Sequence, residues 1–237
     1  FILMGSLWFH AGISKDLYDT VHSWLGHLRG GLAMATVGAC AGFAAVSGSS
    51  LATAATMGTV ALPEMKRYKY SQALATGCVA AGGTLGILIP PSVPLIIYGI
   101  LTQQSIGKLF LAGIIPGVLQ AAFYMAVIHI LCRRNPLLGP PGPKTSLREK
   151  ILSLKNTWVV LILFVGIIGG IYLGIFSPTE AAGVGACGAL IFAIAMRRLR
   201  LSNFKDSLVE TTKTTAMIFV IFLGAMILGY FLAATRL

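Results

Sequence analysis

Residues 30–63 read GGLAMATVGACAGFAAVSGSSLATAATMGTVALP and contain no charged side chain. A single untilted membrane crossing needs only about 20 apolar residues, so this stretch is too long for one crossing. Its middle, residues 47–50, is Ser-Gly-Ser-Ser, which is polar where a crossing should be most apolar. Non-helical backbone at that depth is tolerated only where protein covers it or where it lines a wet cavity. The pattern therefore predicts two half-helices that meet at a serine-rich tip and form a re-entrant hairpin.

A second interrupted stretch, residues 82–91, reads GGTLGILIPP. Pro90 and Pro91 have no N–H group, so in a continuous helix they would leave the carbonyls of Gly86 and Ile87 without donors. The sequence therefore predicts a broken membrane helix. Two broken helices that present free backbone groups are what a secondary transporter uses to bind a small ion and a solute.

The composition supports a polytopic, all-α membrane protein. Of the 237 residues, 56% are hydrophobic and only 11% are charged, and the mean hydropathy is +0.84; a soluble domain does not have this balance. The net charge of +11 does not indicate a nucleic-acid partner, because the basic residues occupy short loops between apolar runs, as expected beside a lipid bilayer. The cysteines are widely separated, and we expect packing residues rather than metal ligands or disulfides: Cys40, Cys78, Cys132 and Cys187.

A short amphipathic segment precedes the hairpin. Ser14 is a candidate N-cap, and Leu17, Val21 and Trp24 follow at helical spacing on one face. This pattern predicts a helix in the membrane interface with Trp24 as its anchor. The alternative is a cytoplasmic linker helix without membrane contact.

Charge and apolar runs divide the chain into five parts. They are the end of a transmembrane helix with the interfacial arm helix (1–29), the re-entrant hairpin (30–70), the broken transmembrane helix with the following span (71–134), a polar linker (135–156) and three further helices (157–237).

The distribution of basic residues predicts the orientation of the chain. If the hairpin is re-entrant, the basic residues of 15–29, 66–69, 133–155 and 197–213 lie on one side of the membrane, with Lys108 opposite. The positive-inside rule makes that basic side cytoplasmic.

Three motifs in this order resemble the large membrane subunit of a tripartite ATP-independent periplasmic (TRAP) transporter: Ser-Gly-Ser-Ser at 47–50, GGTLGILIPPS at 82–92 and SPTEAA at 177–182. The resemblance covers essentially the whole chain. It implies an ion-transporter-like fold of inverted repeats, each with a hairpin and a broken helix, in a sodium-driven elevator-type importer of small organic acids. It also implies a bacterial inner-membrane location and two partners, a small membrane subunit and a periplasmic substrate-binding protein.

On this resemblance, residues 157–237 open a second repeat whose hairpin and broken helix are not included. Both ends of the sequence fall inside apolar runs. We therefore expect a fragment, in which one ion site and the complete solute site need further chain.

Sodium is the one metal ion we expect, as a coupling ion bound by neutral oxygens, with no covalent cofactor. The carboxyl end of the first half-helix offers carbonyls near Ser47, where the helix dipole is negative. The hydroxyl groups of Ser47 and Ser50 can add to these carbonyls. The resemblance implies five sodium ligands: Ser47, Ser50, Gly86, Ile89 and Pro91.

The second half-helix begins near Ser49, and its free N–H groups can receive a carboxylate without an arginine. The candidate solute-binding residues are Ser49, Thr53 and Thr84, and the residues that create the breaks are Gly48, Gly82, Gly83 and Pro90. Two simpler explanations remain open: ordinary helix–helix hydrogen bonding by the serines, and a plain kink at the Gly/Pro stretch.

Two ionisable residues receive structural interpretations. Glu180 follows Ser177 in the pattern of a helix capping box, with pairing to Lys108 or contact with the binding protein as alternatives. His129 fits a packed or interfacial histidine better than a proton relay.

Two rival functions remain, an intramembrane serine protease and a passive channel. Ser47-Gly48 with His129 resembles a Ser/His dyad, but Ala45 stands where a glycine is expected, and His129 lies near a helix end. A channel needs a continuous lined pore, whereas a buried break favours occlusion. We therefore expect a transporter and not an enzyme.

Overall fold

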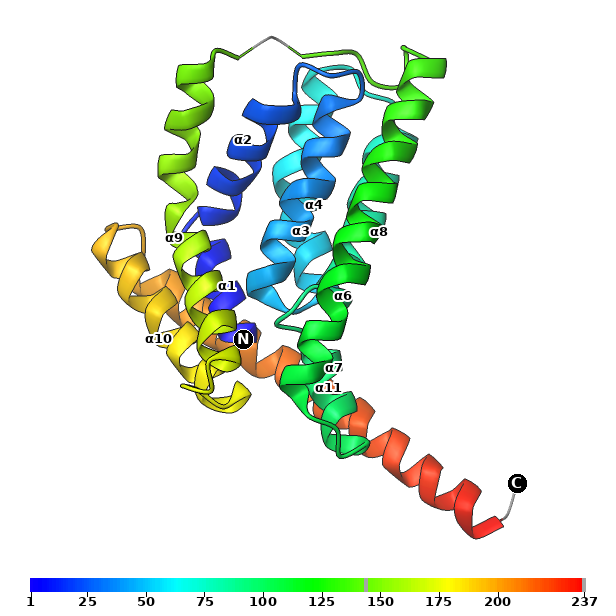
Figure 1. Cartoon of the computed structure of the whole chain (residues 1–237), viewed down its shortest axis with the longest axis vertical. Helices are drawn as coiled ribbons and strands as arrows, with labels where there is room; N and C mark the ends of the chain where they lie inside the picture. Colours follow the sequence, from blue (N-terminus) through cyan, green and yellow to red (C-terminus); the bar gives the residue numbers. More distant parts are fainter. Residues whose placement is uncertain (143–144, 236–237) are drawn as a thin grey trace.

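The computed structural model describes residues 1–142 and 145–235, and the regular secondary structure of these residues is entirely helical (Figure 1). The helices are α1 (Ile2–His10), α2 (Ile13–Leu25), α3 (Gly31–Ser47), α4 (Ser50–Arg67), α5 (Gln72–Gly83), α6 (Leu85–Leu88), α7 (Val93–Leu101), α8 (Ile106–Arg134), α9 (Leu147–Tyr172), α10 (Pro178–Ala195) and α11 (Leu201–Thr235).

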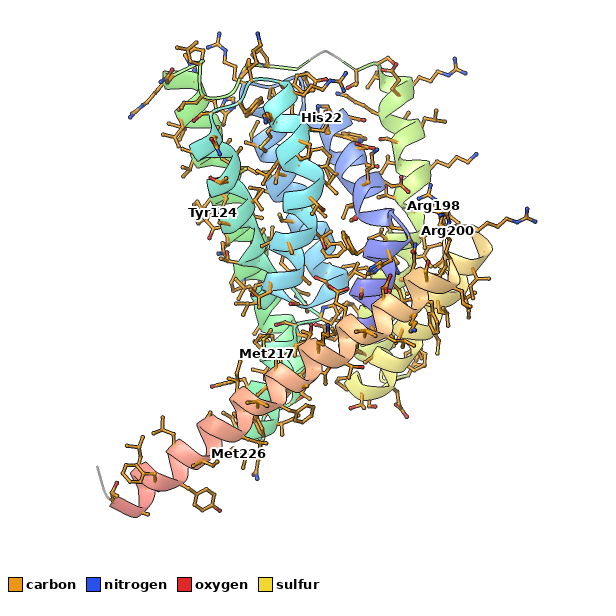
Figure 2. The ribbon with its side chains drawn as sticks, turned by 180° about the vertical axis from the view of Figure 1, so that it is seen from behind. His22, Tyr124, Arg198, Arg200, Met217 and Met226 are labelled. Atoms are coloured by element: carbon orange, nitrogen blue, oxygen red, sulfur yellow. The ribbon has the colours of Figure 1, made fainter. Side chains whose placement is uncertain are left out.

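Among the described residues, four helical segments are long and apolar enough to cross a membrane, and five if the two parts of α9, which bend by 56°, count as one span. The broken segment α5–α7 counts as one of the four, beside α8, α10 and α11. Large apolar side chains project from the exposed faces of α8 and α11 (Figure 2). The chain is therefore an all-α, polytopic membrane protein, as its composition predicts.

The uncharged stretch forms a pair of packed helices, α3 and α4, rather than one long rod. Gly48 ends α3 in the left-handed conformation with φ of 60°, which a glycine adopts without steric cost. Ser49 is extended, and its side chain accepts a hydrogen bond from the amide of Ala52 in the first turn of α4. A C-terminal glycine followed at once by a serine N-cap is what reverses the chain here.

The residues just before α3 and just after α4, which we call the roots of the hairpin, lie at the same end of the molecule. The Gly30 amide donates to the Gly139 carbonyl at 3.0 Å, and the Ser71 amide donates to the Leu138 carbonyl at 3.0 Å. The segment that follows α8 therefore closes over both roots (Figure 1). The start of α3 and the end of α4 are therefore close together in space.

The apolar face of α2 packs against α3. A Cβ built on Gly38 would lie 2.8 Å from Val21 Cγ1, and one built on Gly42 would lie 3.0 Å from Leu17 Cδ2. Small residues thus bring the two helices close. The stripe expected in the membrane interface is covered by α3, although Trp24 is 44% exposed.

The two ends of α2 meet different basic segments. The amide of Gly142 donates to the Gly26 carbonyl just after α2, whereas Arg198, between α10 and α11, forms an ion pair with Asp16 in the first turn (Figure 2). Segments expected on one side of the membrane therefore contact opposite ends of this helix.

Two helix starts test the capping predictions. Ser14 does not cap α2, because the N-cap is Gly12 and Ser14 lies inside the helix. The Ser177–Glu180 capping box is confirmed: the Ser177 amide donates to Glu180 Oε2 at 2.8 Å, and the Glu180 amide donates to Ser177 Oγ at 3.3 Å.

Part of the predicted linker, 135–156, is helical, because α9 begins at Leu147. Ser146 and Glu149 form a second capping box there, a sequence signal that the Pro/Gly-rich composition of the preceding residues obscured. Residues 143–144 of this segment lie outside the described part of the chain.

Candidate ion and solute site

The hairpin tip touches the break in the α5–α7 segment. The Val93 amide donates to the Gly48 carbonyl at 3.1 Å. A Cβ built on Gly48 would lie 2.6 Å from Pro91 O, and one built on Gly86 would lie 2.6 Å from Ser49 O. Both glycines therefore allow a backbone-to-backbone approach that any larger residue would obstruct. Two breaks that lie more than 30 residues apart in the sequence are therefore in direct contact.

Buried hydroxyl groups line the tip. Ser47 is 1% exposed and Thr53 is 0% exposed. Thr53 Oγ1 donates to the Ser49 carbonyl at 2.7 Å and lies 3.0 Å from Ser47 Oγ. Because the proton of Thr53 is used on Ser49, Ser47 is the donor in the second bond, and the lone pairs of its oxygen stay available. Thr53, predicted to contact solute, is thus hydrogen-bonded to both Ser47 and Ser49.

The two carbonyls that the prolines would leave without donors, those of Ile87 and Gly86, differ in their surroundings. Ser92 Oγ donates to the Ile87 carbonyl at 2.5 Å, so the expectation that Ile87 would present a free carbonyl is wrong. Pro90 has no N–H to offer the Gly86 carbonyl. The Ser92 hydroxyl replaces the N–H that Pro91 lacks.

The other residues predicted to create the breaks pack closely. A Cβ built on Gly82 would lie 2.7 Å from Cys40 Sγ, and one built on Gly83 would lie 2.7 Å from Ala54 Cβ. A Cβ on Gly86 would also lie 2.8 Å from the Ser50 amide nitrogen. The tip and the broken helix therefore meet along several turns.

Thr84, a candidate solute-binding residue, contacts α8. Its Oγ1 donates to the Ala81 carbonyl at 2.6 Å and lies 3.1 Å from Gln120 Nε2 and 3.2 Å from Tyr124 Oη. Sequence reasoning missed Gln120 and Tyr124. Two polar side chains four residues apart inside an apolar span were the available signal.

A cavity of about 190 Å³ lies beside the tip, between α1, the first turns of α4, and α11. Ser49 lines it, together with Ser6 and Glu210, whose side chains share a hydrogen bond of 2.6 Å. His10 Nδ1 lies 4.0 Å from the same carboxylate oxygen of Glu210. No motif in the sequence pointed to Ser6, His10 or Glu210, because α1 and α11 are far apart in the chain.

The α2 helix, outside the candidate spans, holds two perturbed groups. Burial lowers the pKa of His22 and raises the pKa of Asp19. The His22 ring lies 6.1 Å from the Tyr18 ring and 6.3 Å from the Tyr68 ring, measured between centroids. This packing holds the imidazole where the charged form is disfavoured.

An all-helical membrane protein in which two interrupted segments meet away from solvent belongs to the general class of polytopic membrane proteins with internal helix breaks. The sequence model described as "Tripartite ATP-independent periplasmic transporter, DctM component" matches residues 1–237. The chain therefore belongs to this family.

Curated relatives agree with the family assignment. The chain is 43% identical to the C4-dicarboxylate TRAP transporter large permease protein DctM of Pseudomonas aeruginosa, over 100% of this chain and 55% of the relative. It is 38% identical to the sialic acid TRAP transporter large permease protein SiaM of Vibrio cholerae, with the same coverage. It is 37% identical to the isethionate TRAP transporter permease protein DctMQ of Oleidesulfovibrio alaskensis, over 97% of this chain and 36% of the relative.

The chain thus spans about half the length of the first two relatives, 55% in each case. The relatives are named as transporter permeases, and the family is not enzymatic. This excludes the serine protease alternative.

Proposed function

We propose that this chain is part of the permease subunit of a sodium-coupled importer of small organic acids that carry a carboxylate. A periplasmic binding protein delivers the solute, and a small membrane subunit completes the transporter. The observation that carries the proposal is the contact between the hairpin tip and the helix break, marked by the Val93–Gly48 backbone bond. Broken helices that meet in this way hold ions and solutes in secondary transporters.

The proposed sodium site uses neutral oxygens. Ser47 Oγ keeps its lone pairs, Gly86 lies against the backbone of Ser49 and Ser50, and Pro91 O lies next to Gly48. The carboxyl end of α3 adds the negative end of a helix dipole. Ser50 and Ile89 complete the proposed set, Ser50 from the first turn of α4 and Ile89 from the break itself.

The proposed solute side is the face of α4 that carries Ser49 and borders the cavity toward α1 and α11. Amide groups in the first turn of α4 point along the helix axis and suit a carboxylate. Thr53 acts there through Ser47 and Ser49. The relatives are named for C4-dicarboxylate, sialic acid and isethionate, which supports an organic acid as the general class.

We further propose that the hairpin is re-entrant and belongs to the moving part of an elevator-type transporter in the bacterial inner membrane. Its two roots are bonded to the 138–139 backbone at one end, close in sequence to the basic residues of 66–69 and of 133–134. The positive-inside rule places this end in the cytoplasm. The turn at 197–200 contacts the opposite end of α2 and adds no support to this orientation.

The test is uptake by the full-length permease, reconstituted with its small subunit and its binding protein. Replacement of external sodium by choline is expected to abolish uptake. Ser47→Ala is expected to do the same, whereas Ser202→Ala, an exposed serine bonded only to the neighbouring Asn203, serves as the matched control. Uptake that persists in choline would contradict the proposal, and sodium-independent equilibration of solute would favour the passive channel.

A further inference from the structure

One face of α8 supports the broken helix along its length. Gly113, Gly117, Gln120 and Tyr124 follow at intervals of four, three and four residues, so they share one side of the helix. All four contact the segment between α5 and the end of the break. We call this set the α8 stripe.

The glycine half of the α8 stripe lies under the end of α6. A Cβ built on Gly113 would lie 2.5 Å from Leu88 O, and one built on Gly117 would lie 2.7 Å from Ile89 Cγ1. These distances leave no room for a side chain. The two glycines therefore let α8 approach the break at backbone distance.

The polar half holds the start of α6. Gln120 Nε2 donates to Tyr124 Oη at 2.7 Å and to Thr84 Oγ1 at 3.1 Å, and Tyr124 Oη lies 3.2 Å from Thr84 Oγ1. The proton of Thr84 is used on the Ala81 carbonyl, so Tyr124 donates to Thr84. The three side chains form a closed network, in which Gln120 and Tyr124 come from a helix whose exposed side chains are mainly apolar (Figure 2).

Thr84 stands two residues before Gly86, and a Cβ on Gly86 would meet the backbone of Ser49 and Ser50. We infer that Gln120 and Tyr124 are positioning residues: by fixing Thr84, they set where the Gly86 carbonyl lies against the hairpin tip. They act through Thr84 and do not touch the ion. The inference rests on the proposed sodium site, and it assigns Thr84 to positioning instead of solute contact.

The first test is the sodium dependence of uptake by the full-length complex. Tyr124→Phe and Thr84→Val each remove one hydroxyl at nearly constant volume. Each is expected to raise the half-saturating sodium concentration about threefold, equivalent to the ~0.6 kcal/mol typical of a hydrogen bond between membrane helices. The maximal rate at saturating sodium is expected to stay unchanged.

Four further variants make this test specific. The Thr84→Val/Tyr124→Phe pair is expected to cost less than the sum of the two single variants, since both remove the bond between Tyr124 and Thr84. Thr84→Ser keeps the hydroxyl and is expected to restore the normal sodium dependence. The matched controls are Tyr98→Phe, an exposed tyrosine, and Thr76→Val, whose hydroxyl bonds only to its own helix.

A second readout does not depend on transport. Hydrogen exchange of the peptide covering residues 84–93 in the purified complex is expected to accelerate about threefold in Tyr124→Phe and to stay unchanged in Tyr98→Phe. If wild-type uptake needs no sodium, the proposed function fails, while the exchange experiment still decides the positioning role. An unchanged exchange rate in Tyr124→Phe, or a lower maximal rate with normal sodium dependence, would overturn the inference.

Discussion

Gly86→Ala is the substitution most sensitive to the contact between the two breaks. Its Cβ would lie 2.6 Å from Ser49 O, 2.7 Å from Ser49 C and 2.8 Å from Ser50 N. All three are backbone atoms, so no side-chain rotation relieves the clash. A close C···O contact needs about 3.3 Å, so the tip and the break must separate by roughly 0.7 Å.

The free-energy cost of that displacement is partly offset by the higher helix propensity of alanine. Alanine favours a helix over glycine by up to ~1 kcal/mol, whereas overpacking typically costs ~1–3 kcal/mol. The free energy of unfolding is therefore expected to fall by ~0–2 kcal/mol. The sodium site is expected to lose much more, because its ligands come from both sides of the gap: the half-saturating sodium concentration should rise at least about tenfold.

Sodium-titrated uptake and thermal unfolding of the full-length complex measure the two effects. Gly77→Ala is the matched control, since it lies on α5 with no atom within 4 Å of its Cβ position. That control is expected to be as stable as the wild type or up to ~1 kcal/mol more stable, with normal sodium dependence. Normal sodium dependence in Gly86→Ala would refute the reasoning that the contact forms the site.

Three other predictions follow from the structure. Glu210→Gln removes a negative charge from the cavity beside the tip and is expected to lower the KM for an anionic solute about twofold to fivefold, measured by uptake kinetics; an unchanged KM would place the solute elsewhere. Because the pKa of His22 is lower in the folded protein than in the unfolded chain, the unfolded chain binds a proton at a higher pH. The free energy of unfolding is therefore expected to fall as the pH drops below about 6.5. His22→Asn should reduce that fall, measured by thermal unfolding between pH 7.5 and 5.5. Ser177→Ala removes a capping box and is expected to cost ~1 kcal/mol of stability, detectable as a lower Tm.

Local sequence signals predicted the elements whose cause is local. The uncharged run with Gly48 inside it was enough to place the chain reversal, and Pro90 was enough to place the second break, because backbone chemistry decides both. The Ser177–Glu180 cap depends on residues three positions apart. The Ser14 cap was wrong because Gly12, in the left-handed conformation with φ of 72°, starts the helix two residues earlier.

Contacts between distant segments could not be read in this way. Ser6 and Glu210 are 204 residues apart in the sequence and form a hydrogen bond, and spacing alone gives no reason to pair them. Thr84 has a hydroxyl that suits a solute equally well, and only its position against Tyr124 and Gln120 gives it a different partner.

The way the hairpin roots are fastened has a consequence for sequence variation. The bonds from Gly30 and Ser71 to the segment after α8 join main-chain atoms at both ends, and the Tyr70 hydroxyl adds a side-chain link, since it accepts from the Leu32 amide and donates to the Pro140 carbonyl. At the tip, one added methyl group on Gly48 or Gly86 meets a neighbouring backbone. The Ser71 and Leu138 positions can therefore vary in side chain without loss of their backbone bond, whereas Gly30, whose Cβ would lie 2.7 Å from Cys132 Sγ, is as restricted as the two glycines at the tip.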